Sequence, residues 1–300
     1  MSSPAMKEMS SAPRSCRICR SSAAFAGAKN DFRLFRCSGC GFLFVDPLPQ
    51  DVLAIYNDDY FSGAAEGHGY TDYDRDKEPM RPVFEEYLRR MEKLGGAGRI
   101  LDVGAATGYF LDIARKRGWD TAGVEPSNFA ADLGRKKGLD VRTGVLEDSD
   151  FAPASFDVIS LWDVLEHLPD PEKTVRDLKR LLKPGGIFAF NTPDVDSMWA
   201  KGMGMNWHLI VPPEHIHLFG RRSAVQLLQN CGFEPVEVTT IGKTFTVQYV
   251  LQTLGHWLKM SVFTKGGEKL KGSWLGNLGV PINLRDNMFV IARLNPEQRS

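Results

Sequence analysis

The central part of the chain alternates short, mostly apolar runs with amphipathic stretches. Runs at 100–103, 121–124 and 156–161 have the length and the β-branched residues of buried strands. Residues 109–114 place apolar side chains at helical spacing directly after the first of these runs. The alternation predicts strand–helix–strand units, which build a parallel sheet covered by helices.

Proline and glycine mark the limits of the next elements. Pro171 is expected to open a helix that runs to Leu182, because proline suits the first turn of a helix. Residues 183–186, Lys-Pro-Gly-Gly, should end this helix before a strand at 187–190. A further strand is predicted at 140–143.

The flanking segments are less regular. Residues 42–45 predict a strand that ends at prolines. Residues 51–95 predict two helical pieces separated near 63–69, the second running from 81 to 94. Apolar side chains recur at helical spacing over 245–263, which predicts another helix.

The turn after the first central run is the main candidate for ligand binding. Gly104 and Gly108 stand four residues apart with Ala106 between them, and the next strand ends on Glu125. A dinucleotide fingerprint needs Gly-x-Gly-x-x-Gly, and this turn has neither that spacing nor a lysine or arginine to cradle phosphate. A carboxylate at the end of the strand can accept hydrogen bonds from two neighbouring ribose hydroxyls. The turn therefore favours a nucleoside without a pyrophosphate.

The pattern Asp102-x-Gly104-x-Ala106-x-Gly108 resembles the first motif of class I S-adenosylmethionine-dependent methyltransferases, and later blocks resemble that family in the same order from about 98 to 195. The resemblance implies a Rossmann-like α/β sheet with helices on both faces, S-adenosylmethionine as cofactor and methyl transfer as activity. It also implies that 233–238 and 288–294 are strands that pair antiparallel. Ala106 replaces the glycine that the family more commonly has.

The resemblance assigns cofactor contacts residue by residue. From the methionine arm to the adenine, the expected contacts are Asp102, Gly104, Ala106, Gly108, Glu125, Pro126, Ser127, Val145 and Leu146. Within this set Glu125 should hold the ribose. Val145 replaces an aspartate that often bonds the adenine, so the Leu146 amide and apolar contact are expected to serve instead.

Aromatic residues are expected close to the reacting groups. The resemblance places Trp162 and Asp163 beside the sulfonium and the acceptor, where an aromatic face can attract a cation. Packing under the sheet edge is the alternative for Trp162. Tyr70 and Tyr73, in a loop of the predicted lid, are expected either to bond the methionine carboxylate or the acceptor, or to pack the lid.

Four cysteines form a second motif. Cys16-x-x-Cys19 and Cys37-x-x-Cys40 are separated by seventeen residues, the spacing of a tetrahedral four-thiolate zinc site. Such a zinc would be structural, because four protein ligands leave no open position for a substrate. A redox pair and unliganded core cysteines are the alternatives. Cys231 stands apart and is expected to be a small buried apolar residue.

An insertion at 196–220 supplies the candidate catalytic base. Sugar C-methyltransferases of a zinc-bearing bacterial branch resemble this chain and carry a Glu-His pair beside the acceptor, which Glu214-His215 matches. Histidine can take a proton near neutral pH, and an adjacent carboxylate can orient it. The competing candidates are His167, His208 and His217. Two further alternatives are a structural role for the insertion and a second metal site made by His208, His215 and His217.

Composition and charge narrow the partners. Lys and Arg total 37, and so do Asp and Glu, which leaves no electrostatic footprint for nucleic acid. No run reaches the roughly 18 apolar residues needed to span a bilayer. Residues 1–15 lack an apolar signal core and predict a disordered tail, so a cytoplasmic location is expected.

The predicted organisation has four parts. After the tail come a zinc-binding module at 16–48, a helical lid at 49–95 and a methyltransferase domain at 96–300, with acceptor-side insertions at 196–220 and 243–287. The stripe at 245–263 is expected to pack on the domain or on a second copy in a homodimer. A cap over an apolar acceptor and shallow membrane contact are its alternatives.

The sequence as a whole predicts methyl transfer to oxygen or carbon of a small-molecule or sugar-like acceptor, including sugar nucleotides and glycans. Three other functions stay open: an RNA methyltransferase whose zinc module binds nucleic acid, a protein that binds S-adenosylmethionine without chemistry, and a nicotinamide oxidoreductase. The neutral charge argues against the first, the Glu214-His215 pair against the second, and the glycine spacing against the third.

Overall fold

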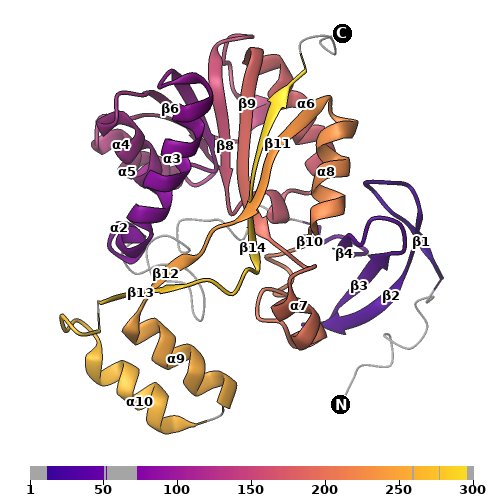
Figure 1. Cartoon of the computed structure of the whole chain (residues 1–300), viewed down its shortest axis with the longest axis vertical. Helices are drawn as coiled ribbons and strands as arrows, with labels where there is room; N and C mark the ends of the chain where they lie inside the picture. The colour runs from indigo at the N-terminus through magenta and orange to yellow at the C-terminus, as the bar shows by residue number, and fades with distance from the viewer. Residues whose placement is uncertain (1–11, 51, 53–72, 259, 277, 296–300) are drawn as a thin grey trace.

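The computed structural model describes residues 12–50, 52, 73–258, 260–276 and 278–295. Its central strands are β5 (Arg99–Val103), β6 (Asp120–Glu125), β7 (Asp140–Thr143), β8 (Phe156–Trp162), β9 (Leu182–Pro193), β11 (Phe233–Thr240) and β14 (Asn287–Leu294). They form a seven-stranded sheet in the order β11-β14-β9-β8-β5-β6-β7 (Figure 1). The strands from β7 to β9 are parallel, whereas β14 is antiparallel to both of its neighbours. The Rossmann-like α/β fold and the antiparallel terminal strands are confirmed.

Helices cover both faces of this sheet. They are α3 (Arg81–Gly95), α4 (Tyr109–Lys116), α5 (Asn128–Lys136), α6 (Pro171–Leu181) and α8 (Arg221–Asn230). The first three lie on one face and the last two on the other (Figure 1). Each face has its own buried cluster, and strand side chains alternate between them, with Ile100 on the α3 and α4 side and Leu101 on the α6 and α8 side. Short 3-10 turns are η3 (Glu78–Met80), η4 (Leu146–Asp148), η5 (Leu165–His167) and η6 (Gly204–Asn206).

A second sheet joins the N-terminal module to the insertion. Its strands are β1 (Arg14–Ser15), β2 (Ser22–Lys29), β3 (Phe32–Cys37), β4 (Leu43–Val45) and β10 (His217–Leu218), in that order. The insertion contributes β10, which pairs antiparallel with β4 and places His217 opposite Phe44. It also contributes α7 (Met198–Met203), and its Trp207 is buried with Leu34 of β3 in one apolar cluster. The module and the insertion therefore share a sheet and a core.

The chain forms a helical hairpin between β11 and β14. The strands β12 (Lys243–Thr246) and β13 (Gly279–Ile282) pair as a two-stranded ribbon, and α9 (Val247–Leu258) and α10 (Ser261–Leu270) follow one another between them. Figure 1 shows this hairpin projecting below the central sheet. Before the sheet, α2 (Tyr73–Lys77) leads through η3 into α3. None of the helices in the described ranges is long and apolar enough to cross a membrane.

Several sequence predictions need correction. The fifth strand begins at Leu182 rather than 187, because the Lys-Pro-Gly-Gly turn is itself taken up into β9 beside a bulge in its pairing with β8. The helix predicted at 245–263 is two helices with a break at Met260, preceded by a strand. Arg14 and Ser15, assigned to the tail, form β1. The rest of the tail up to residue 11, the first lid piece and Tyr70 lie outside the described residues.

Candidate functional site

A cavity of about 1550 Å³ opens at the carboxyl ends of β5, β6, β8 and β9. Ligands of open α/β sheets bind at this edge, where the helix connections change from one face to the other. The volume exceeds the roughly 300–1,000 Å³ of ordinary single-ligand pockets. The cavity therefore has room for a cofactor and a second small molecule together.

The glycine turn forms one wall of this cavity and is held by Glu125. Gly104 has a φ of +76°, and a Cβ there would lie 2.6 Å from Cγ2 of Val164. Ala106 has a φ of +48°, a left-handed conformation unusual for a residue with a side chain. Its backbone N–H donates to Oε2 of Glu125 at 2.8 Å, and the Ser127 N–H donates to Oε1 at 3.0 Å. The Glu125 carboxylate thus holds the glycine turn in place through its hydrogen bond with Ala106.

Two buried acids lie at the end of these strands. Burial raises the pKa of Glu125 to about 7, against the opposing effect of its two backbone donors. Burial also raises the pKa of Asp102 well above its usual value, and the nearby Glu125 adds to this rise. The hydroxyl of Ser160 donates to Asp102 at 2.6 Å and favours the ionised form. A ligand that brings hydroxyl donors or positive charge would stabilise the ionised form of both carboxylates.

Most of the predicted site residues line the same cavity. The lining includes Tyr73, Gly104, Ala106, Glu125, Pro126, Val145, Leu146, Trp162, Asp163, Glu214 and His215. Asp102 and Gly108 lie behind its wall: Asp102 is 2 % exposed, and Gly108 is the N-cap of α4. Ser127 is likewise buried and caps α5 through its hydroxyl. Asp102 and Gly108 thus belong to the turn without lining the cavity, and their contact with the cofactor stays a prediction.

Trp162 packs in the aromatic core and also lines the cavity, and its contact with a sulfonium stays a prediction. Its ring stacks on Tyr87 with centroids 4.6 Å apart, lies 6.1 Å from Phe289 and meets Phe110 edge-on at 5.2 Å. These contacts fix the indole within the aromatic core between α3 and the sheet. The same residue also lines the cavity, so packing sets the orientation of a face that a ligand can contact.

A polar network beside Trp162 was missed by the sequence analysis. The side chain of Asn191 accepts from the Asp163 N–H at 2.8 Å and donates to the Asp163 carboxylate at 2.7 Å. It also donates to Oδ1 of Asn287 at 3.1 Å. Asp163 is held at a φ of +54° by these contacts. The only sequence signal for Asn287, a cavity residue, was a polar side chain opening an otherwise apolar strand.

The insertion brings two histidines together at the cavity. His215 places Nδ1 2.7 Å from the Leu209 carbonyl, and His167 places Nδ1 2.8 Å from the Glu214 carbonyl. A carbonyl can only accept, so each Nδ1 is the donor in its hydrogen bond. The two rings meet edge to face at 4.8 Å, and desolvation in the cavity wall lowers the pKa of His167.

The remaining predictions for the insertion fare differently. The Leu209 carbonyl orients His215, and the Glu214 backbone carbonyl orients His167. Assistance to the base by the Glu214 carboxylate stays a prediction. His208 lies 3.9 Å from Asp286, and His217 is fully buried against Phe42. In the described part of the chain, metal-type clusters form from the four cysteines and from Glu166 with His167 and His215, not from the three insertion histidines.

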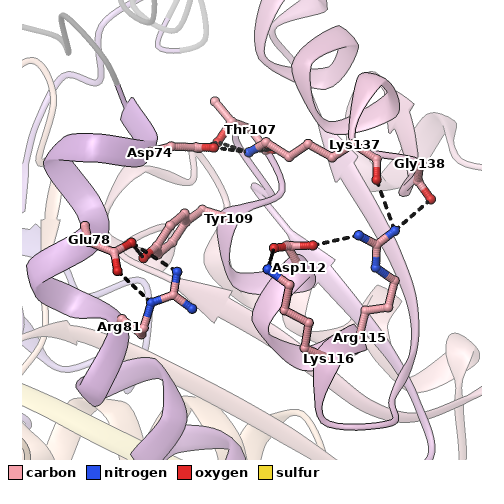
Figure 2. Close-up of polar contacts among 10 residues, drawn as sticks. All are labelled: Asp74, Glu78, Arg81, Thr107, Tyr109, Asp112, Arg115, Lys116, Lys137 and Gly138. Carbon is pink, nitrogen blue, oxygen red and sulfur yellow. Dashed lines mark hydrogen bonds and ion pairs between the residues drawn. The ribbon is translucent and has the colours of Figure 1, made fainter.

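The segment before α3 closes one side of the cavity. Figure 2 shows Asp74 of α2 reaching Thr107 of the glycine turn and Lys137, which follows α5. Glu78 accepts from the Tyr109 hydroxyl at the start of α4 and pairs with Arg81. These contacts dock α2 and η3 onto the turn. Tyr73, predicted in a loop, is the first residue of α2 and lines the cavity from this docked segment.

The four cysteine sulfurs gather at one point, as their spacing predicted. All four lie within 4.8 Å of one another, with Cys16 and Cys40 3.7 Å apart and Cys19 and Cys37 3.3 Å apart. These separations are too long for disulfides, whose sulfurs lie about 2.05 Å apart. The N–H groups of Gly39 and Cys40 point at the Cys37 sulfur at 3.3 and 3.4 Å, a knuckle geometry that stabilises a thiolate. Cys231 is 2 % exposed and buried apart from them, as predicted.

Comparisons with known proteins agree with this geometry. Residues 73–238 match a family model described as a methyltransferase domain. A ubiquinone biosynthesis O-methyltransferase of Chromobacterium violaceum is 26% identical over 222 residues, 65% of this chain and 94% of that protein. Its counterpart in Paraburkholderia phymatum is 34% identical over 151 residues, 47% of this chain and 65% of that protein. Further curated relatives of that name align over about half their length.

Solved structures share the fold. A protein of Bacillus halodurans assigned to the methyltransferases superposes with a TM-score of 0.51 at 16% identity, over 70% of this chain and 99% of that one. The sheet order, the glycine turn and the cavity together define a class I S-adenosylmethionine-dependent methyltransferase. The chain belongs to the methyltransferase family whose domain its residues 73–238 match.

Proposed function

We propose that the protein transfers a methyl group from S-adenosylmethionine to a hydroxyl oxygen of a small organic acceptor, with His215 as general base. The observation that carries the proposal is the place of His215 in the cavity wall, where the hydrogen bond between its Nδ1 and the Leu209 carbonyl at 2.7 Å orients the ring. A neutral imidazole with a lone pair can remove a hydroxyl proton near neutral pH.

The sheet order supports a division of the cavity. Glu125 ends β6 and Val145 follows β7, so the ribose and the adenine are proposed at the β6 and β7 side. Asp102 is proposed to face the ammonium end of the methionine arm through the turn at Gly104–Ala106. The opposite side, at β8, β9 and β14, is then left for the acceptor, and Trp162, Asn287 and His215 lie there.

Bound S-adenosylmethionine supplies an electrophilic methyl group on a sulfonium, and the transfer is an in-line displacement. The protein has to hold the acceptor oxygen on the far side of that methyl and accept its proton. Trp162 offers an aromatic face to the sulfonium, because a π-system attracts a cation. His215 accepts the proton, and neutral His167, 4.8 Å away, keeps a second positive charge out of the cavity.

A structural zinc is proposed for Cys16, Cys19, Cys37 and Cys40. Four convergent thiols in a double knuckle suit tetrahedral Zn²⁺, which thiolates select over harder metals. The module also contacts the insertion directly, because Lys29 Nζ donates to the Trp207 carbonyl at 3.1 Å and Val45 N–H donates to the Ile216 carbonyl at 2.9 Å. In this proposal the metal keeps the base in position and takes no part in the reaction.

Oxygen is preferred over carbon as the methylated atom because the curated relatives are named O-methyltransferases. The test is incubation of the purified protein with S-adenosylmethionine and a panel of phenols, catechols and sugar nucleotides. Mass spectrometry should detect a product heavier by one methyl group, and fragmentation should place that group on oxygen. A product methylated on carbon would support the sugar C-methyltransferase reading instead and would refute the oxygen assignment.

A further inference from the structure

The hairpin of α9 and α10 presents one face of α10 away from the rest of the protein. The two helices approach closely through glycines: a Cβ on Gly255 would lie 2.5 Å from Cγ2 of Thr264, and one on Gly267 would lie 2.8 Å from Cγ of Gln252. The side of α10 that carries Gly267 is thus turned toward α9. In Figure 1 the hairpin hangs clear of the sheet, so the opposite side of α10 faces outward.

That outward face is both basic and apolar. Val262, Lys265 and Lys269 are exposed and stand three and seven residues apart, which aligns them opposite Gly267 on the helix. The segment after α10 adds a further exposed residue, Trp274, which is 77 % exposed. A tryptophan so exposed beside lysines is typical of proteins that lie on a membrane surface, where the ring settles at the headgroup level.

Two backbone hydrogen bonds hold the segment after α10 against the first turn of α9. The Gln248 N–H donates to the Gly276 carbonyl at 3.1 Å, and the Val247 N–H donates to the Leu278 carbonyl at 3.0 Å. Leu275 and Leu278 are 45 % and 53 % exposed in this held segment. Apolar side chains are therefore displayed on an ordered frame next to the basic face of α10.

Charge decides whether a second copy of the protein or an anionic surface is the better partner for this surface. Residues 247–278 contain four lysines and one glutamate, a net charge of +3, within a chain whose formal net charge is zero. The rest of the protein is therefore net acidic. A homodimer that paired the same patch on two copies would bring like charges together, because a two-fold interface repeats one surface on both subunits. An anionic surface would instead be attracted.

We infer that the outer face of α10, formed by Val262, Lys265 and Lys269, docks the protein on an anionic lipid surface together with the exposed Trp274 that follows this helix. The cavity reaches the same hairpin, since Tyr249, Gln252, Lys271 and Gly272 belong to its lining. A docked molecule would therefore hold its cavity entrance beside the lipid, within reach of a membrane-held acceptor. The docking itself does not depend on the proposed reaction, and it is measured without turnover.

The test is flotation of the full-length protein with unilamellar vesicles. One set is pure phosphatidylcholine and the other contains one third phosphatidylglycerol. The protein should float with the anionic vesicles at low salt and be released at high salt, because surface attraction of lysines is screened. Lys265→Glu with Lys269→Glu should lower the partition coefficient at least about 30-fold, since each lysine near such a surface contributes about fivefold. Trp274→Ala should weaken it as well.

A matched control changes the same charge elsewhere. Lys93 and Lys136 are exposed on α3 and α5, and Lys93→Glu with Lys136→Glu should leave anionic vesicle binding within about twofold of the wild-type level. Equal losses in the two double variants would mean that net charge alone acts, and would overturn the docking surface. Failure of the wild-type protein to float, or a dimer in sedimentation velocity that Lys265→Glu and Lys269→Glu disperse, would overturn it too.

Discussion

The side-chain amide of Asn30 donates a 2.9 Å hydrogen bond to the backbone carbonyl of Pro212 and so joins the cysteine module to the insertion that carries His215. Asn30 sits in the tight turn between β2 and β3, at a φ of +48°. Pro212 is three residues before the proposed base. The sheet of the cysteine module and the proposed catalytic loop are thus parts of one structure, although they are far apart in the sequence.

Removal of the metal is expected to loosen the base while sparing the cofactor end. Purified protein should contain about one zinc per chain by elemental analysis. Cys16→Ala with Cys40→Ala should abolish that zinc and lower turnover at least tenfold, because the insertion loses its partner sheet. The affinity for S-adenosylhomocysteine should change less than threefold, since the glycine turn lies in the other half. A fully active protein without zinc would contradict the assigned role.

Replacement of Glu125 should remove the ribose contact and part of the support of the turn. Glu125→Ala is expected to weaken S-adenosylhomocysteine binding about 100-fold in calorimetry, since it removes a charged acceptor and leaves the Ala106 and Ser127 N–H groups without their partner. Glu147→Ala, on the same side of the cavity but half exposed, is the matched control and should bind normally. Tight binding of NADH by the wild-type protein would refute the cofactor assignment.

Cofactor affinity should depend on pH around neutrality. The pKa of Glu125 is raised to about 7 in the free protein, so the carboxylate that ribose hydroxyls need is mostly protonated at pH 6. Binding that restores an ordinary pKa should be about tenfold tighter at pH 8 than at pH 6 and should release protons. The same shift means that the ligand-free fold loses stability as pH rises through 7. Glu125→Gln should flatten the binding profile; an unchanged profile in that variant would assign the effect to another group, such as Asp102.

Ala106 is expected to carry backbone strain. Ala106 has a φ of +48°. In this left-handed conformation a Cβ lies too close to the following carbonyl oxygen, and the crowding costs roughly 1–2 kcal/mol for a residue other than glycine. Ala106→Gly should therefore increase the free energy of unfolding by up to about 1 kcal/mol after the entropy of glycine is subtracted, with cofactor affinity retained. Ala106→Val should lower both stability and affinity. Urea unfolding measures the first effect, and destabilisation by Ala106→Gly would contradict the strain.

The sequence predicted the elements whose residue pattern follows directly from their place in the fold. The runs from 98 to 190 predicted the parallel strands, since their side chains are buried on both faces and leave a plain apolar signal. The acid that ends β6, the glycine turn and the four cysteines could be singled out because each stands at a characteristic spacing; the structure brings Glu125 to the turn and the four sulfurs together. The β2 and β3 hairpin was missed because its exposed positions carry alanine and glycine, which are weak strand formers.

Contacts between distant segments could not be read from the sequence. The pairing of β10 with β4, the approach of His167 to His215 and the link from Asp163 through Asn191 to Asn287 join residues that are 28 to 175 positions apart. The groups that orient the two histidines were also beyond prediction, because adjacency in sequence does not fix which atom bonds an imidazole ring. Backbone carbonyls took that role for both rings.

The measurement that tests the account most directly is the turnover of His215→Ala beside its affinity for S-adenosylhomocysteine, with the acceptor found in the methylation panel. Loss of a positioned general base should lower kcat by about 10²–10⁴-fold while calorimetry shows the wild-type affinity. His208→Ala, whose histidine belongs to the same insertion but lies beside Asp286, should retain most of the activity. A His215→Ala enzyme with wild-type turnover would contradict the proposed base and require the proton to leave by another group.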